Sequence, residues 1–258
     1  MLARNHDLLL SILPFEKAWY AARTPQLRVE FVGHPLVDRH AAGSSNAGGS
    51  GGLPGREGVG SSGVKPLVVL LPGSRRGELT RHWPVLREAA AQIAAAMPVR
   101  LCAVVPSDEL AAAARQGGHL PPGLEIRVGG LAEALSQASL ALASTGTVTL
   151  ECAWFRVPTV ALYRTSWSTY QIGKRLITVP YLAMPNLLAG REVMPELIQA
   201  AATPENLARK ALEVLRDPVR QREIRGQLDA VVAGLGETGA CRRAAAHILS
   251  LGQGSVAK

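Results

Sequence analysis

Aromatic side chains are scarce in this sequence, where Phe, Trp and Tyr together make up 4% of the 258 residues. Proteins that bind nucleic-acid strands stack bases on aromatic rings, and the sequence shows neither an aromatic-rich ribonucleoprotein motif nor zinc-finger spacing. The formal net charge of +8 still predicts a surface that attracts anions. We therefore expect nucleotides or anionic lipids as partners, and no nucleic acid.

Cysteine pairs, metal-ligand spacings and long apolar runs are missing as well. The three cysteines, Cys102, Cys152 and Cys241, form no C-x-x-C pair, and the six histidines show no paired ligand spacing. No metal and no cofactor is implied. The apolar run Leu8 to Leu13 is too short to span a bilayer and lacks the form of a signal peptide. These absences predict a cytoplasmic protein without a transmembrane helix.

The hydrophobic share of 47%, against 19% charged residues, is enough for a substantial core. Short apolar runs alternate with segments of helical periodicity, which favours a parallel sheet because parallel strands need crossover connections. The expected fold class is α/β, a Rossmann-like parallel sheet with helices on both faces, followed by terminal helices. The expected strands lie at residues 67–71, 99–105, 124–128, 140–143 and 159–163, and the terminal helices near residues 204–216, 219–232 and 239–251.

Two other regions differ from this alternation. A strand, a helix and a strand are predicted near residues 7–13, 15–22 and 29–32. Residues 41–64 are mostly Gly, Ser and Ala, which predicts a flexible insertion without a catalytic part. Residues 177–191 are expected to form a loop.

The heptad Thr145-Gly146-Thr147-Val148-Thr149-Leu150-Glu151 links an expected strand to an expected helix. A turn at this kind of junction binds phosphate through unpaired N–H groups, and Gly146 and Thr147 are small enough to let a phosphate approach. Glu151, one turn on, suits the two hydroxyls of a ribose, so the heptad favours a nucleotide diphosphate. The alternative is the N-cap and first turn of a core helix, with Thr145 or Thr147 as the cap.

Two further loops carry candidate ligand groups. The segment Gly73-Ser74-Arg75 comes after the strand at residues 67–71. Gly73 gives the backbone conformational freedom, and the Arg75 guanidinium offers several N–H donors to phosphate oxygens. In residues 184–191, the Pro, Asn, Gly and Arg content suggests a fixed loop from which Asn186 and Arg191 face a sugar or phosphate. The alternatives are a polar turn with a solvated arginine, and a structural loop in which Asn186 hydrogen-bonds the backbone.

Six motifs in order and register along nearly the whole chain resemble lipid-A-disaccharide synthase. They are Ile12-Leu13-Pro14-Phe15-Glu16, Gly33-His34-Pro35, Leu71-Pro72-Gly73-Ser74-Arg75 with Glu78, Thr145 to Glu151, Pro185 to Arg191, and Pro195-Glu196-Leu197-Ile198-Gln199. Two departures are Thr145, where the family usually has serine, and Val148, where it usually has alanine.

The resemblance implies a GT-B glycosyltransferase that transfers a diacylglucosamine unit from UDP-diacylglucosamine to a lipid acceptor, diacylglucosamine 1-phosphate, and releases UDP. Residues 1–40 would be a remnant of the amino-terminal acceptor domain, 41–64 an insertion, and 65–258 the UDP-sugar-binding domain. The proposed general base of the family lies in the amino-terminal domain, so no catalytic residue is assigned here. The expected partners are that domain, in trans or through a homo-oligomer, and an anionic membrane surface at the inner face of the inner membrane.

The resemblance also implies residue roles. Arg75 and Thr147 would contact the diphosphate, Glu151 the ribose, and Asn186 and Arg191 the UDP or the sugar beside it. Glu196 and Gln199 would line the same cleft. Two other classes stay open: another UDP-sugar enzyme of this fold, such as a UDP-N-acetylglucosamine epimerase, and a binding module without activity.

Overall fold

The computed structural model describes residues 2–44, 65–166 and 179–254. By contacts the chain divides into two compact units, Arg56–Asp229 and a smaller unit that joins Met1–Gly55 to Ala230–Lys258. The three-part domain division expected from the sequence stays a prediction. Residues 45–64 of the expected insertion lie outside the described residues.

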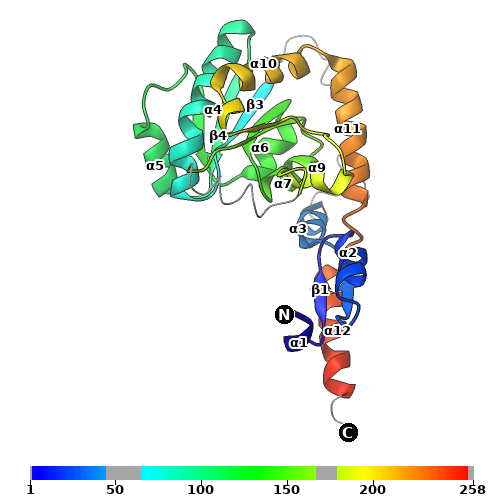
Figure 1. The fold of residues 1–258 in the computed structure, drawn as a ribbon. Coiled ribbons are helices and arrows are strands. Elements are labelled where there is room, and N and C mark those ends of the chain that lie inside the picture. The colour runs from blue at the N-terminus through cyan, green and yellow to red at the C-terminus, as the bar shows by residue number, and fades with distance from the viewer. Residues whose placement is uncertain (1, 45–64, 167–178, 255–258) are drawn as a thin grey trace. The chain divides into compact units, whose positions relative to one another are not determined.

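The larger unit contains a six-stranded, wholly parallel sheet (Figure 1). Its strand order is β5-β4-β3-β6-β7-β8, so the chain first builds outward from β3 on one side and then on the other. This is the doubly wound Rossmann arrangement expected from the sequence. The strands are β3 (Leu67–Leu71), β4 (Arg100–Val105), β5 (Leu124–Val128), β6 (Leu140–Ser144), β7 (Thr159–Tyr163) and β8 (Glu196–Ile198).

Helices cover both faces of this sheet, as predicted. On one face α4 (Arg76–Ala96) packs on β3 and β6, with α5 (Asp108–Gln116) and α10 (Pro204–Leu215) beside it. On the other face lie α6 (Leu131–Gln137) and α7 (Val148–Trp154), and α9 (Met184–Ala189) packs against α7. α11 (Pro218–Ala233) follows α10 in the chain.

The core of the larger unit lies on the central strands. Every residue of β3 and β6 is buried, because both faces of these strands are covered by helices. Cys102 and Cys152 are free thiols inside this core, as expected for small hydrophobes. Burial raises the pKa of Cys152 to about 12, so its thiol stays protonated at neutral pH.

The smaller unit has its own parallel pair, β1 (Leu9–Ser11) with β2 (Val29–Phe31). The Arg243 guanidinium donates hydrogen bonds to the carbonyls of Val32, Glu237 and Thr238, so this cation holds the unit together. The Asp38 carboxylate accepts from the N–H groups of Gly239 and Cys241. The helices of the unit are α1 (Leu2–Asn5), α2 (Glu16–Arg23), α3 (Pro35–Ser44) and α12 (Ala240–Gly254).

Several elements differ from the sequence predictions, the short helices at Leu2–Asn5 and Gln199–Ala201 among them. Residues 184–189 are not loop but the helix α9, with Pro185 in its first turn and Gly190 in the left-handed conformation after its end. Proline and glycine at these two places are helix boundary signals as well as loop signals. The strand β8 and the helix α3, which includes residues 41–44, were not predicted. Part of the expected loop, residues 177–178, lies outside the described residues.

No helix in the described ranges is long and apolar enough to cross a membrane.

Candidate nucleotide site

A cavity of about 680 Å³ lies where the strand order of the sheet reverses. β3 and β6 are neighbours in parallel register, with Leu71 beside Ala143. Their helices then leave to opposite faces of the sheet, which opens a crevice beyond the carboxyl ends of the strands. The volume is that of a typical small-molecule site. The cavity is lined by Leu71, Gly73, Ser74, Arg75, Glu78, Val104, Val105, Pro106, Gly129, Gly130, Leu131, Ser144, Thr145, Gly146, Thr147, Val148 and Glu151.

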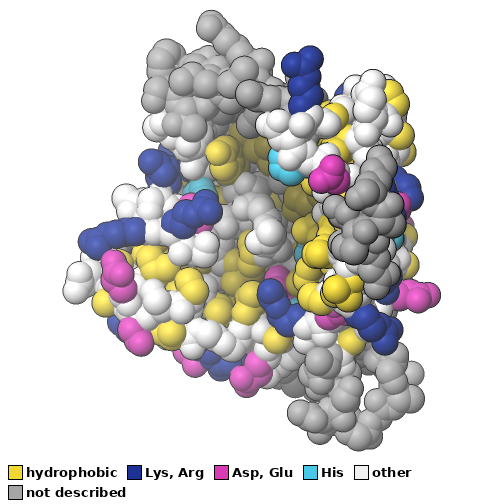
Figure 2. Space-filling view, turned by 90° about the horizontal axis from the view of Figure 1, so that it is seen from below, with side chains coloured by type: hydrophobic (Ala, Val, Ile, Leu, Met, Phe, Trp, Pro, Cys, Tyr) yellow, Lys and Arg dark blue, Asp and Glu magenta, His cyan; other side chains and the backbone are white. Residues whose placement is uncertain are grey.

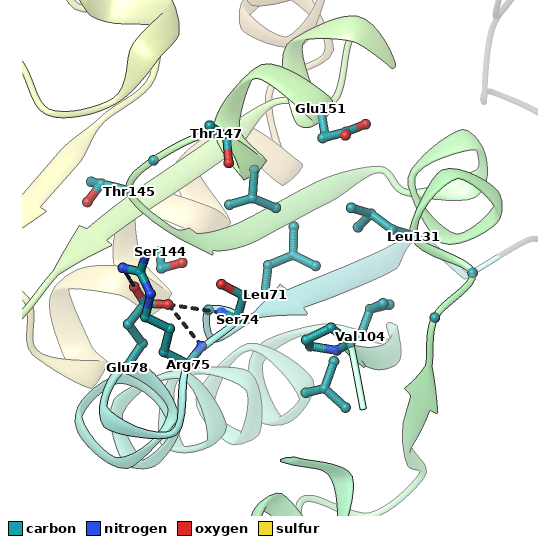
Figure 3. Close-up of a pocket in the computed structure, with 17 residues that line it drawn as sticks. Leu71, Ser74, Arg75, Glu78, Val104, Leu131, Ser144, Thr145, Thr147 and Glu151 are labelled. Atoms are coloured by element: carbon teal, nitrogen blue, oxygen red, sulfur yellow. Dashed lines mark hydrogen bonds and ion pairs between the residues drawn. The ribbon is translucent and has the colours of Figure 1, made fainter. Parts of the chain in front are cut away.

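The turn between β6 and α7 presents backbone to this cavity (Figure 3). Gly146 has a φ of +119°, and a Cβ added there would meet no heavy atom within 4 Å, so the space beside the turn is open. The Thr149 hydroxyl donates to the Gly146 carbonyl at 2.6 Å and accepts from the Met184 N–H at 3.2 Å. Thr147 is exposed and lines the cavity. Its side chain makes no hydrogen bond that caps α7, so the alternative in which Thr147 is the cap is not observed.

Glu151 lies one helical turn beyond Thr147 and lines the same cavity. Its side chain is largely buried, with 9% of the residue exposed. A carboxylate can accept hydrogen bonds from hydroxyl groups, and contact of Glu151 with a ribose stays a prediction.

Across the cavity from Thr147, the loop after β3 carries Arg75 and is fastened by Glu78 (Figure 3). Glu78 Oε2 accepts from the N–H groups of Ser74 at 2.9 Å and Arg75 at 3.3 Å, and Oε1 lies 3.5 Å from Arg75 Nη1. Gly73 has a φ of +116°, and an added Cβ would collide with the Glu78 carboxylate. Glycine is therefore required at residue 73 by both its backbone angle and this carboxylate.

The buried His82 fastens the same loop from the protein interior. Its Nδ1 lies 2.9 Å from the Pro72 carbonyl oxygen, and its Nε2 lies 3.2 Å from the Arg164 N–H. The Arg164 carbonyl oxygen also lies 3.2 Å from Nε2, so the Arg164 backbone offers this nitrogen both a donor and an acceptor. His82 thus ties the loop after β3 to the end of β7.

The apolar end of the cavity was not predicted. Val104, Val105 and Pro106 come from the end of β4, and Gly130 and Leu131 from the start of α6. These residues carry no motif that a sequence search recognises, since only their place at the carboxyl ends of β4 and β5 makes them part of the site. A flat, largely apolar group such as a nucleobase fits such walls.

Seven of the predicted site residues line the cavity, whereas the other four do not. Those in the lining are Gly73, Ser74, Arg75, Thr145, Gly146, Thr147 and Glu151; those outside it are Asn186, Arg191, Glu196 and Gln199.

Asn186 is fully buried at the centre of a separate hydrogen-bond network. Its Nδ2 donates to the Met194 carbonyl and to Glu196 Oε1, both at 2.7 Å, and its Oδ1 accepts from the N–H groups of Val193 at 2.7 Å and Met194 at 2.8 Å. Glu196 also accepts from the N–H groups of Leu182 and Ala183. The structural alternative considered for Asn186 therefore describes its observed contacts, and this network holds α9 to β8.

Gln199 and Arg191 take different positions. The Gln199 amide forms a two-way pair with the backbone of Thr165, accepting from its N–H at 3.0 Å and donating to its carbonyl at 3.3 Å. Gln199 has a φ of +51°, which is uncommon for a residue with a side chain. Arg191 is exposed beyond α9. Ligand contact by Asn186, Arg191, Glu196 or Gln199 stays a prediction.

In sequence, the chain is similar to proteins of one family. A family model described as lipid-A-disaccharide synthetase matches residues 1–249. The lipid-A-disaccharide synthase of Syntrophus aciditrophicus is 37% identical over 254 residues, covering 95% of this chain and 63% of that protein. The enzyme of the same name from Azotobacter vinelandii is 36% identical, with 96% and 63% covered. The chain thus spans about 63% of the length of these relatives.

Solved structures support the fold. A putative UDP-N-acetylglucosamine 2-epimerase from Listeria monocytogenes has a TM-score of 0.55 at 18% identity, covering 97% of this chain and 61% of its own. The glycotransferase of kitacinnamycin has a TM-score of 0.54 at 18% identity, covering 95% and 54%. At these identities the likeness shows the Rossmann-like fold of glycosyltransferases and no more.

The Asn186 network predicts a large effect on stability. We expect Asn186→Ala to lower the free energy of unfolding by at least about 2 kcal/mol, because two buried N–H groups and a buried carbonyl lose their partner. Urea unfolding followed by circular dichroism measures the loss. Asn206→Ala is the matched control, since Asn206 donates to the Ala201 carbonyl at an exposed position. Equal losses in the two variants would contradict the structural role of Asn186.

Proposed function

Since the chain belongs to the lipid-A-disaccharide synthetase family, we propose that it binds UDP-diacylglucosamine and takes part in transferring diacylglucosamine to diacylglucosamine 1-phosphate, with release of UDP. The observation that carries this proposal is the convergence of the family's Pro72–Arg75 and Thr145–Glu151 motifs on one cavity. These motifs are far apart in the sequence and meet only through the pairing of β3 with β6.

The proposal assigns the parts of a UDP group to different regions of the cavity. We assign the diphosphate to the open turn around Gly146 and Thr147, with Arg75 opposite it, and the ribose to Glu151. The base then occupies the apolar end beside Pro106 and Leu131. Asn186, Glu196 and Gln199 act as positioning residues in this scheme, because their polar atoms hold the backbone of α9, β8 and Thr165. Arg191, which is exposed, is assigned to the sugar side.

The chemistry asked of these residues is stabilisation of a leaving group. When the bond between the sugar and the diphosphate breaks, negative charge develops on the phosphate oxygens, and donors such as the Arg75 guanidinium and backbone N–H groups stabilise it. No metal ion is part of this scheme. We propose that the attacking hydroxyl is deprotonated by a general base of the family's amino-terminal domain.

The two alternatives differ from this proposal in the reaction. The structural likeness to a UDP-N-acetylglucosamine 2-epimerase concerns the fold alone, and the sequence relatives are synthases. A binding module without activity would retain the cavity but form no disaccharide with any added domain.

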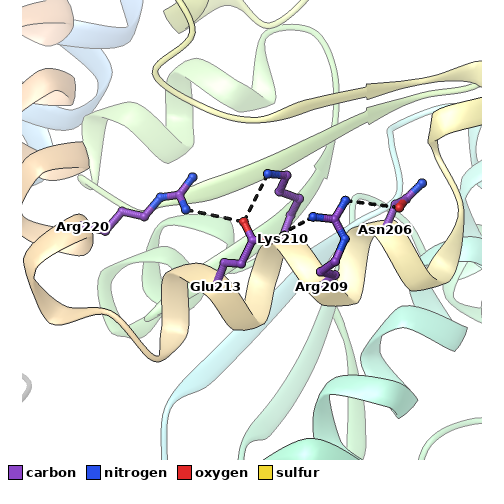
Figure 4. A network of polar contacts seen from close by, with 5 residues as sticks. All are labelled: Asn206, Arg209, Lys210, Glu213 and Arg220. Atoms are coloured by element: carbon purple, nitrogen blue, oxygen red, sulfur yellow. Dashed lines mark hydrogen bonds and ion pairs between the residues drawn. The ribbon is translucent and has the colours of Figure 1, made fainter.

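We further propose peripheral association with the cytoplasmic face of the inner membrane through α10 and the start of α11. There, Arg209, Lys210 and Arg220 surround the single carboxylate of Glu213 (Figure 4). Three cations around one anion leave a local excess of positive charge. Arg216 and Arg222 are exposed nearby in sequence. On the face drawn in Figure 2, by contrast, cationic and anionic side chains are interspersed.

UDP binding should depend on Arg75 and Glu151 in different ways. Arg75→Ala is expected to weaken UDP binding by roughly 1.5–3 kcal/mol, the range for a charge-assisted hydrogen bond, and to leave uridine binding unchanged. Glu151→Ala should weaken both ligands, since both contain the ribose. Isothermal titration calorimetry measures these affinities. Arg76→Ala is the control, because Arg76 pairs with Glu109 and lies outside the cavity lining. Unchanged UDP binding in Arg75→Ala would refute the assignment.

Disaccharide formation by residues 1–258 should depend on an added acceptor-binding domain. We expect the chain alone to turn over UDP-diacylglucosamine and diacylglucosamine 1-phosphate slowly or not at all, and an added amino-terminal domain to restore product. Thin-layer chromatography of radiolabelled lipid detects the disaccharide. Full turnover by the chain alone would refute the need for a second domain, and no turnover in any combination would favour the binding module.

Vesicle binding should be electrostatic. Sedimentation with vesicles of anionic lipid should fall as salt rises, and vesicles of zwitterionic lipid should bind little. The double variant Arg216→Gln, Arg222→Gln should bind less, since each basic residue near an anionic bilayer contributes on the order of 1 kcal/mol. Arg127→Gln on β5 is the control, as Arg127 pairs with Glu125. Binding that is indifferent to salt would argue against this surface.

A further inference from the structure

Anionic side chains outnumber cationic ones in the described part of the cavity lining, which is unfavourable for a diphosphate. Among the described residues that line it, Arg75 is the cation, and Glu78 and Glu151 are carboxylates. A pyrophosphate group in this space is repelled by both carboxylates. Glu151 has a place in the ribose assignment, whereas Glu78 has none.

Glu78 occupies the groups that a phosphate would use. Its Oε2 takes the N–H groups of Ser74 and Arg75, and its Oε1 lies 3.5 Å from the Arg75 guanidinium. Backbone N–H groups before a helix and an arginine fork are typical donors to phosphate oxygens. Glu78 itself stands in the first turn of α4, where the helix dipole favours negative charge.

The Arg75 side chain is largely exposed to solvent. It is 83% exposed, against 32% for that of Glu78. The ion pair is therefore weak enough for a ligand to compete with it, because exposed pairs of this kind contribute little stability.

We propose that Glu78 is an internal competitor of the ligand's diphosphate, which limits the affinity of the site for UDP and so promotes product release. This inference rests on the proposed function. The terminal phosphate of free UDP carries more negative charge than the diphosphate diester of a UDP-sugar. A fixed carboxylate beside that phosphate disfavours the product more than the donor substrate, and Glu78 sets this preference.

The test compares charge with shape at residue 78. Glu78→Gln keeps an oxygen acceptor for the loop N–H groups but removes the charge. We expect the Kd for UDP to fall about tenfold, the size of one charge interaction at a partly exposed site, with slower dissociation in stopped-flow experiments. The Kd for UDP-N-acetylglucosamine should fall less, and that for uridine should not change. Glu78→Asp keeps the charge, so the Kd for UDP should fall less than in Glu78→Gln.

Glu88→Gln on the exposed side of the same helix is the matched control and should alter none of these values. A merely structural role for Glu78 predicts weaker binding of UDP and uridine alike, with a lower melting temperature. That result, or an unchanged Kd for UDP in Glu78→Gln, would overturn the inference.

A titration with inorganic pyrophosphate separates the inference from the proposed function. If no variant binds UDP, the proposed function fails. If Glu78→Gln then still binds pyrophosphate more tightly than the unsubstituted protein, the competition by Glu78 stands, and if it does not, the inference fails too.

Discussion

The parallel pairing of β3 with β6 is the constraint on which the candidate site depends. Both strands are wholly buried, and their register brings Leu71 beside Ala143. Two loops that are far apart in the sequence therefore begin at one point and separate toward opposite faces. A register shift of one residue would turn every side chain of a strand to the other face, so the buried core fixes the mouth of the cavity as well as the sheet.

Carboxylates and amides shape the loops of this basic protein from within. Each of three carboxylates accepts hydrogen bonds from backbone N–H groups. Glu78 does so in the loop after β3, Glu196 before α9, and Asp38 at the N-terminus of α12 in the smaller unit. Asn186 uses both ends of its amide for backbone groups. These contacts fix the backbone of the loops through hydrogen bonds that range from exposed to buried.

Membership of the lipid-A-disaccharide synthetase family gives this arrangement a context. The proposed function asks the site to hold a nucleotide firmly enough to position the sugar and loosely enough to release UDP. In that proposal, apolar walls would hold the base, an open turn would receive the phosphates, and a carboxylate would compete for Arg75.

The sequence by itself determined the sheet and part of the site. The strands at residues 67–71, 124–128 and 159–163 agree with the structure to the residue, because short apolar runs between turn residues are local signals. The cavity position of Arg75, Thr147 and Glu151 followed from their place after strands. Tertiary structure alone decided the rest. Whether Pro185 and Gly190 bound a loop or a helix depends on packing against α7, and β8 is a strand because β7 offers it an edge. Val104 and Leu131 became walls of the cavity through strand order. The hydrogen bond from Asn186 to Glu196 depends on how α9 meets β8, which no spacing in the chain encodes.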